Sequence, residues 1–244
     1  VVINKNRTLI DMKELGKPAY HLIDVDWYAS VTKYVIRRVA AVAAVIYTGR
    51  GCPYKCNFCA SNVVWHTNSK GGKNATFVRW RPLDHVMEEL ALLQNKYGFD
   101  FFYILDDTFG INEEQTIAFC EAYKASGLKM LWGAETRVSC IKNPKIVQAL
   151  REAGCIQLDF GVEKASDEQM HLLKKGTKVR EVKETFKNCH ELGIRAFANM
   201  LINTPGETEQ DLKDTMDLLE EIKPNIVSIN IFTPYPGTEI FADT

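Results

Sequence analysis

Beyond residue 42, runs of apolar residues alternate with segments whose apolar residues recur every three or four positions. The apolar runs predict strands, and most are continuous rather than alternating, which is typical of parallel strands buried on both faces. These runs lie at 43–48, 100–105, 129–134, 156–161, 194–202 and 226–232. They indicate a parallel sheet at the centre of the protein.

The segments between these runs have the periodicity of amphipathic helices. Their apolar faces comprise Leu83, Val86, Met87, Leu90, Leu93 and Tyr97; Val179, Val182, Phe186 and Cys189; and Leu212, Met216 and Leu219. Residues with the spacing of helix N-caps are Asn112 with Gln115, Asn143 before Pro144, and Ser166 with Gln169. Glycines expected to close helices before the next strand are Gly98, Gly127, Gly154 and Gly193.

Strands that each lead into a helix predict an α/β fold, which we interpret as a parallel barrel or a fragment of one. A doubly wound sheet has the same alternation, so the pattern alone leaves both architectures open. Residues 1–42 stand outside the alternation, and we expect them to form an extended lead-in from an upstream domain, packed on the outside of a core at 43–244. The first residue is Val1 rather than methionine, which indicates a piece of a longer protein.

Composition narrows the class of protein. The chain has 244 residues, of which 46% are hydrophobic and 25% charged, as in ordinary globular proteins. The net charge of −1 gives no general attraction to nucleic acid or to anionic lipid, so neither partner is expected. The apolar run at 39–47 is too short to span a bilayer. Seven cysteines, an odd number with three bunched together, indicate a reducing, cytoplasmic compartment.

Three of these cysteines, Cys52, Cys56 and Cys59, lie within eight residues directly after the first predicted strand. Gly51 and Pro53 favour a loop there, at the edge of a parallel fold where active sites gather. Three thiolates are three quarters of the usual ligand set of a 4Fe–4S cluster. A cluster held by three cysteines leaves one iron open to substrate or cofactor.

Zinc is an alternative, because it accepts three cysteines and one histidine, and His66 follows Cys59 by seven residues. Structural zinc sites usually pair their cysteines in two separated knuckles, and only one is present here. A cluster- or zinc-stabilised module without enzymatic activity therefore stays open at this point. The remaining cysteines, Cys120, Cys140, Cys155 and Cys189, have the spacing of isolated buried thiols.

The CxxxCxxC spacing of Cys52, Cys56 and Cys59, with an aromatic Phe58 before the last cysteine, resembles the radical S-adenosylmethionine superfamily. The resemblance extends over residues 43–240. It includes the segments Gly161–Ser166, Leu201–Thr208 and Pro234–Thr238, each after a predicted strand. It implies a partial TIM-type (β/α)6 barrel and a 4Fe–4S cluster that binds S-adenosylmethionine (SAM). One electron from the reduced cluster then cleaves SAM to a 5′-deoxyadenosyl radical, which abstracts hydrogen from a substrate.

The resemblance also implies roles for individual residues. Phe58 is expected near the adenine, unless it only shields the cluster. Asp106 or Asp107, at the end of the second strand, is expected to hold the SAM amino group, with a loop or capping role as the alternative for either. Arg137 is expected at the methionine carboxylate or in a structural ion pair.

Three further residues follow later strands. Glu163 and Ser166 occupy a segment similar to the family's ribose-binding segment, although Ser166 also suits a helix cap. Asn203 stands in the segment similar to the adenine-binding one, where family members often have glycine. We expect Asn203 to place an amide near the adenine or the substrate.

The segment Leu15–Asp24, Arg50–Tyr54 and the two proline-glycine segments resemble the subgroup that carries a cobalamin-binding domain. That subgroup includes carbon methyltransferases and a tetrapyrrole ring cyclase. The resemblance therefore implies methylation or ring formation, with cobalamin as a further cofactor. A methylthiotransferase acting on RNA or protein shares much of this core and is the alternative. The implied partners are a small-molecule substrate and an electron donor such as flavodoxin or ferredoxin.

Overall fold

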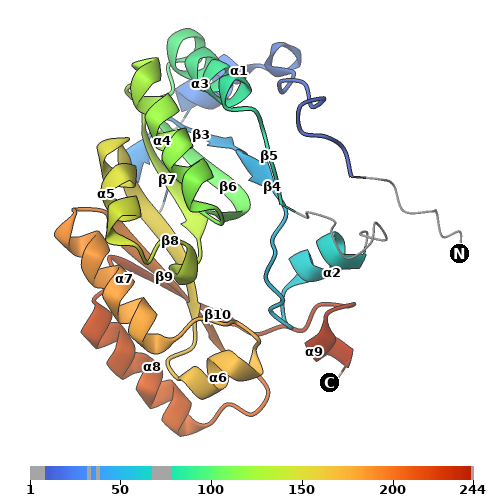
Figure 1. Cartoon of the computed structure of the whole chain (residues 1–244), viewed down its shortest axis with the longest axis vertical. Coiled ribbons are helices and arrows are strands. Elements are labelled where there is room, and N and C mark those ends of the chain that lie inside the picture. The colour runs from blue at the N-terminus through green and yellow to red at the C-terminus, as the bar shows by residue number, and fades with distance from the viewer. Residues whose placement is uncertain (1–8, 32–33, 37–38, 68–77, 243–244) are drawn as a thin grey trace, which may run out of the picture.

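The computed structural model describes residues 9–31, 34–36, 39–67 and 78–242 (Figure 1). Its centre is a six-stranded, all-parallel sheet in the order β10-β9-β8-β7-β6-β3. The strands are β3 (Ala43–Ile46), β6 (Phe101–Phe109), β7 (Leu131–Thr136), β8 (Cys155–Glu163), β9 (Arg195–Ile202) and β10 (Ile226–Ile231). Since β3 and β10 are the two edges, the sheet in these ranges is open, and the partial (β/α)6 barrel is confirmed.

Helices line the outer, convex side of this sheet (Figure 1). They are α3 (Leu83–Tyr97), α4 (Glu113–Ser126), α5 (Pro144–Glu152), α7 (Val179–Glu191) and α8 (Glu209–Ile222). Each follows a strand or loop in the order that the periodicity predicts. The predicted N-caps are confirmed, since the side chains of Asn112, Asn143 and Ser166 accept hydrogen bonds from the first turns of their helices.

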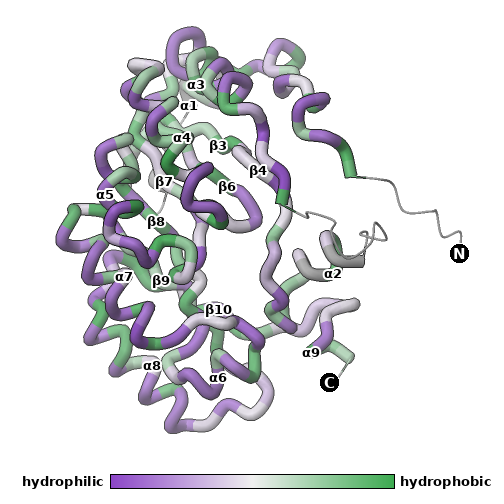
Figure 2. Tube along the Cα trace, viewed as in Figure 1, coloured by the Kyte–Doolittle hydropathy of each residue, from purple (hydrophilic) through white to green (hydrophobic). Residues whose placement is uncertain are grey.

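The main core lies between the sheet and these helices. Trp132 is fully buried there, with ring centroids 5.7 Å from Phe102 and 5.4 Å from Phe119. Figure 2 shows the same division, with hydrophobic tube in the central strands and hydrophilic turns on the outer helices. A smaller cluster of Phe101 and Tyr103 fills the inside of the barrel at the amino-terminal ends of the strands. The opposite end of the barrel is therefore left for the functional site.

Two of the predicted apolar helix faces are buried, and the third is only partly so. Val86, Leu90 and Leu93 of α3 are fully buried, as are Val182, Phe186 and Cys189 of α7. On α8, however, Leu212 is 43% and Met216 55% exposed, while Leu218 and Ile222 face the core. The outer face of the edge strand β10 is also apolar and exposed at Ile229 and Ile231.

The lead-in is not extended throughout. It contains a short 3-10 helix η1 (Tyr20–Leu22), the helix α1 (Val25–Val31) and an antiparallel pair of strands, β1 (Tyr34–Ile36) and β2 (Val39–Ala41). It packs on the outside of the core as predicted, because Val25 joins the main core and the Tyr20 hydroxyl donates to Glu89 of α3 over 2.5 Å. Helix α1 begins at a local cap, because the Asp24 carboxylate accepts from the Trp27 N–H over 3.1 Å, and the packing of Val25 holds the helix against the core.

Smaller elements complete the described structure, and several of them lie across the barrel from the outer helices (Figure 1). They are β4 (Gly49–Arg50), β5 (Arg79–Trp80), α2 (Ala60–Thr67), η2 (Val138–Cys140), α6 (Asp167–Leu172) and α9 (Glu239–Ala242). In the described ranges, no helix has both the length and the apolar character to cross a lipid bilayer.

Candidate active site at the mouth of the barrel

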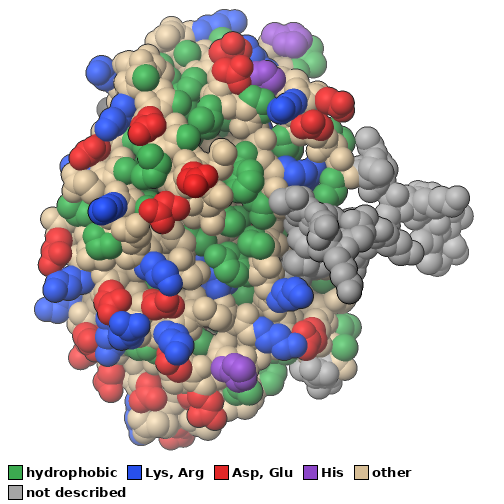
Figure 3. All heavy atoms as spheres, viewed as in Figure 1, with side chains coloured by type: hydrophobic (Ala, Val, Ile, Leu, Met, Phe, Trp, Pro, Cys, Tyr) green, Lys and Arg blue, Asp and Glu red, His purple; other side chains and the backbone are tan. Residues whose placement is uncertain are grey.

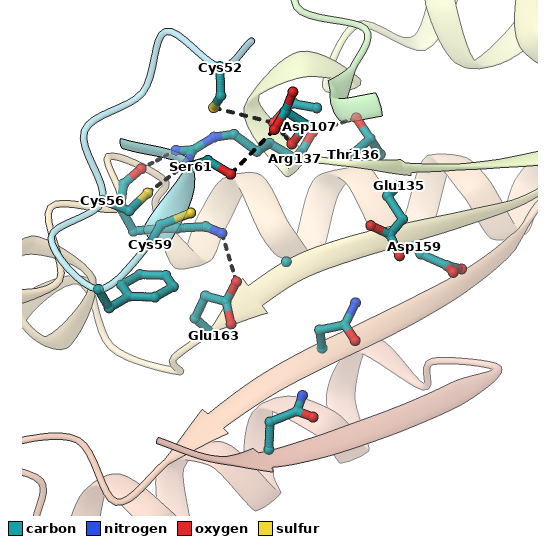
Figure 4. Close-up of a pocket in the computed structure, with 16 residues that line it drawn as sticks. Cys52, Cys56, Cys59, Ser61, Asp107, Glu135, Thr136, Arg137, Asp159 and Glu163 are labelled. Carbon is teal, nitrogen blue, oxygen red and sulfur yellow. Dashed lines mark hydrogen bonds and ion pairs between the residues drawn. The ribbon is translucent and has the colours of Figure 1, made fainter. Parts of the chain in front are cut away.

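A cavity of about 320 Å³ opens at the carboxyl ends of the parallel strands. Side chains from the loop after β3 and from β6, β7, β8, β9 and β10 line it (Figure 4). This is the position at which parallel barrels carry their active sites, because the loops that follow different strands meet there. The cavity is large enough for part of a cofactor or a small substrate.

The three clustered cysteines line this cavity together. Cys52 Sγ lies 3.5 Å from the Thr108 hydroxyl, and the Cys59 N–H donates to the Cys56 carbonyl over 3.2 Å, which turns the loop back on itself. Burial raises the pKa of the Cys52 thiol, and the hydrogen bond from Thr108 opposes that rise. A metal at Cys52 must therefore displace a proton.

Asp107 ties both ends of the cysteine loop to β6. Its carboxylate accepts from the Gly51 N–H over 2.8 Å, before the first cysteine, and from the Trp65 indole N–H over 2.9 Å, in the helix after the last. The Ser61 hydroxyl is a further donor at 3.4 Å. Gly51 has φ of 98°, a backbone conformation that favours glycine.

The neighbouring Asp106 points away from this cavity. It is buried beneath β4, where it accepts from the Thr48 N–H over 2.7 Å and from the Thr48 hydroxyl over 2.5 Å. Burial raises the pKa of Asp106 to about 6, against the hydrogen bonds that lower it. The structure therefore separates two residues that the sequence treats alike, and only Asp107 lines the cavity.

Arg137, just after β7, is buried behind the cysteine loop. Its guanidinium donates to Cys56 Sγ over 3.2 Å and stacks on the Tyr54 ring, with its central carbon 3.8 Å from the ring centroid. It also donates to the Lys175 carbonyl and, over 3.4 Å, to the Thr177 hydroxyl. These contacts hold the cysteine loop in place. Arg137 therefore has a structural role and also lines the cavity.

Glu163 faces the cavity from the end of β8, where it pairs with Lys175 over 2.9 Å (Figure 4). Its φ of 71° is in the left-handed region, next to a register shift between β8 and β9. Such strain at a non-glycine residue often marks a functional position. A Cβ at Gly161 would lie 2.6 Å from the Glu163 carboxylate, so the ion pair closes over a position that only glycine fits.

The remaining predicted residues differ in their distance from the cavity. Phe58 lines it and packs beside Leu173 and Phe232. Ser166 caps α6, accepting from the Gln169 N–H over 3.1 Å, and does not line the cavity. Asn203 also lies outside the lining.

The backbone around Asn203 is fixed by a buried ion pair. Its φ is 63°, and its N–H donates to Glu207, which also pairs with the fully buried Lys164. This left-handed backbone conformation favours glycine or asparagine. The left-handed backbone therefore accommodates asparagine at position 203, and the role of its side-chain amide stays a prediction.

Sequence reasoning missed the polar residues that point inward along the strands. Glu135 and Asp159 are in register on β7 and β8, and both line the cavity, as do Asn199 on β9 and Asn230 on β10 (Figure 4). Asp159 is buried and accepts from the Tyr103 hydroxyl. The available signal was a polar residue inside an otherwise apolar strand, which marks the inner face of a barrel.

The donor set fits an iron–sulfur cluster. Three thiols from one loop line one cavity, and in the ranges described all cysteines lie outside disulfides. Among those residues, no three His, Cys, Asp or Glu side chains converge on a point that suits a single ion. A 4Fe–4S cluster makes no such demand, since each cysteine ligand binds a different iron. The His66 side chain, the possible fourth zinc ligand, lies outside the described residues.

Residues 46–219 match the family model described as the radical SAM superfamily. The chain belongs to this superfamily. Its cofactors are therefore the 4Fe–4S cluster and SAM, and the sequence-based assignment is confirmed.

Curated relatives align with most of this chain. It is 30% identical over 233 residues to an uncharacterized methyltransferase of Pyrococcus horikoshii, covering 95% of this chain and 46% of the relative. It is 29% identical to the anaerobic magnesium-protoporphyrin IX monomethyl ester cyclase of Cereibacter sphaeroides, covering 91% and 35%. The chain thus spans less than half the length of these relatives.

Among solved structures, the radical SAM methyltransferase TsrM of Kitasatospora setae, with cobalamin and a [4Fe–4S] cluster bound, has the same fold. The TM-score is 0.70 at 18% identity, covering 81% of this chain and 38% of TsrM. The identity is low enough that this likeness concerns the fold alone.

Proposed function

We propose that this chain is the core of a cobalamin-dependent radical SAM enzyme that methylates a small organic molecule or closes a ring in it. The observation that carries this proposal is the single cavity in which Cys52, Cys56 and Cys59 meet carboxylates from the ends of β6 and β8. The relatives support the reaction class, since their names describe methyltransferases and a cyclase. TsrM supports the use of cobalamin, which we assign to a domain preceding the lead-in of residues 1–42.

Cys52, Cys56 and Cys59 would hold the cluster, and SAM would bind in the same cavity. When bound, these two groups supply the radical that removes hydrogen from the substrate. Among the neighbouring residues we propose Asp107 for the SAM amino group and Glu163 for the ribose hydroxyls, because both carboxylates line the cavity. Phe58 covers the adenine side and excludes water.

The other predicted residues position the loops around the cavity. Arg137 keeps Cys56 in place through its hydrogen bond to the sulfur, and Asp106 holds the turn after β3. Ser166 caps a helix, and the backbone at Asn203 shapes the loop after β9. The substrate enters the inner end of the cavity, where Glu135, Asp159, Asn199 and Asn230 supply hydrogen-bonding groups.

Partners and compartment follow from this chemistry. The cluster needs an external electron donor, for which we propose a flavodoxin or a ferredoxin. A reducing, cytoplasmic setting suits a chain with seven cysteines, three of them clustered in one loop.

Metal analysis tests the proposal directly. Anaerobic purification should give a brown protein with about four irons per chain, which cleaves SAM when reduced with dithionite. Cys56→Ala should lose iron and cleavage while circular dichroism stays unchanged, and the matched control Cys120→Ala, in α4 away from the cavity, should keep both. A colourless protein with one zinc, or SAM cleavage by Cys56→Ala, would refute the proposal.

The reaction class needs a separate measurement. The full-length protein should bind hydroxocobalamin and transfer the methyl group of SAM to a small molecule. Transfer of a methylthio group to RNA or to a protein would instead identify a methylthiotransferase.

A further inference from the structure

A second hollow, of about 380 Å³, lies on the surface beside the cysteine loop. It is formed by α6 and the segment that links α6 to α7, and its lining includes His171, Lys174, Thr177 and Lys178. Asp167 is the acidic residue in this lining, and its carboxylate accepts from the Val179 N–H over 2.8 Å. The hollow is separate from the cavity that the cysteines line.

The segment around this hollow is strongly basic. Residues 171–180 contain five basic side chains, His171, Lys174, Lys175, Lys178 and Arg180, and no acidic ones. All but Lys175 are exposed, and Figure 3 shows Lys, Arg and His side chains over the region where Figure 1 draws α6, with Asp and Glu side chains next to them. Two of the exposed charges have partners, since Lys174 pairs with Glu239 and Arg180 with Glu184. Such surface pairs are weak and exchange easily with a partner's carboxylates.

The basic segment is bonded directly to the cysteine loop. The Asn57 N–H donates to the Leu173 carbonyl over 3.2 Å, and the Asn57 side chain donates to the Leu172 carbonyl over 2.8 Å. Lys174 and Lys175 are neighbours that face opposite ways, one lining the hollow and the other lining the cavity. One thin wall of protein therefore separates the hollow from the cavity.

Two side chains connect the hollow to a cysteine sulfur through hydrogen bonds. The Thr177 hydroxyl lines the hollow side and accepts from Arg137 over 3.4 Å. Arg137 in turn donates to Cys56 Sγ over 3.2 Å. A molecule seated in the hollow would thus be two side chains away from the site that we assign to the cluster.

We propose that this hollow and its basic rim form the docking surface for an acidic one-electron carrier of the flavodoxin type. Positive charge around the entry point steers an acidic protein and orients it. The step transfers one electron: the carrier's flavin hydroquinone is oxidised to the semiquinone, the oxidised cluster is reduced, and no bond to carbon forms or breaks. The inference rests on the proposed function, because it assumes the cluster at the three cysteines.

Charge reversal at the hollow tests the proposal. The double variant Lys174→Glu/Lys178→Glu should lower the rate of SAM cleavage driven by reduced flavodoxin by about tenfold or more at low ionic strength. Lys174→Gln/Lys178→Gln should fall between this variant and the unmodified protein. The matched control Lys183→Glu/Lys187→Glu reverses two lysines further along α7, which pair with Glu221 and Glu191, and should keep the full rate.

Two further measurements separate a docking defect from a catalytic defect. Reduction with dithionite needs no docking, so all variants should then cleave SAM at the same rate. Binding of oxidised flavodoxin, measured by calorimetry at low ionic strength, needs no SAM cleavage and should weaken about tenfold or more in Lys174→Glu/Lys178→Glu while staying unchanged in the control. Equal flavodoxin-driven rates in the hollow variant and the control would overturn the docking surface. Failure of the unmodified protein with dithionite would instead overturn the proposed function.

Discussion

The guanidinium of Arg137 donates a hydrogen bond to the sulfur of Cys56 across 3.2 Å, from behind the loop that carries all three clustered cysteines. A charged donor at a cluster sulfur stabilises the reduced, more negative cluster and so raises its reduction potential. The same group anchors the loop to the rest of the barrel. Electronic tuning and loop position thus depend on one side chain.

Arg137→Lys should therefore lower the midpoint potential of the cluster, because a lysine cannot reach the sulfur, the Lys175 carbonyl and the Tyr54 ring together. We expect a loss of about 1–3 kcal/mol in the free energy of unfolding as well. A redox titration followed by electron paramagnetic resonance, with urea unfolding alongside, measures both. Arg151→Lys, exposed on α5, is the control, and an unchanged potential in Arg137→Lys would contradict the role.

Gly161→Ala should weaken SAM binding. The new methyl group would lie 2.6 Å from Glu163 Oε1 and 2.7 Å from Lys175 Nζ, so this ion pair must move. We expect the dissociation constant for SAM to rise about tenfold, which corresponds to about 1.4 kcal/mol. Anaerobic calorimetry of the cluster-loaded protein measures the change. Gly16→Ala has open space around it and should bind SAM normally; equal affinities of the two variants would argue against Glu163 at the ribose.

Lys164→Met should destabilise the fold strongly. It leaves Glu207 buried without its cation, and breaking a buried pair in this way costs about 3–5 kcal/mol. Lys164→Met/Glu207→Gln removes the unpaired charge and keeps an acceptor for the Asn203 N–H, so it should recover much of the loss. Urea unfolding of both variants checks this. If the double variant is no more stable than the single one, the pair does not act as a unit.

The raised pKa of Asp106 should make the free energy of unfolding depend on pH. Its pKa in the folded protein is about 6, above the ordinary value of 3.8, so the folded chain binds more protons than the unfolded chain between these values. The free energy of unfolding contributed by Asp106 therefore falls as pH rises from about 4 to 6, by about 3 kcal/mol in total. Asp106→Asn should lack this fall. Parallel stability profiles of the two proteins between pH 4 and 7 would contradict the prediction.

The barrel could be predicted because its signal is repeated. Each buried strand is an apolar run, and side chains such as Asn112 and Ser166 cap their helices with local hydrogen bonds that do not depend on the rest of the fold. The lead-in helix α1 also has a local signal, since the Asp24 carboxylate accepts from the Trp27 N–H over 3.1 Å, but packing of Val25 against the core decides where the helix lies. On α8 the periodicity was present, but Leu212 and Met216 lie on the exposed side.

The site was less predictable because neighbouring strand residues face opposite ways. Asp106 and Asp107 look equivalent in sequence, yet a register irregularity between Ile104 and Phe109 and the alternation of side chains send only Asp107 to the cavity. Lys175 could not be predicted at all, since it reaches Glu163 from a loop twelve residues later whose path the sequence does not specify. The cysteines were predictable because their spacing is itself the chemical requirement.

The loop of Cys52, Cys56 and Cys59 is fastened at three places, to Asp107 at the end of β6, to Arg137 after β7 and, through Asn57, to the carbonyl of Leu172 at the end of α6. These anchors belong to separate elements of the barrel. A substitution that loosens one of them therefore leaves two others to position the sulfurs, so damage to the loop should be graded rather than complete.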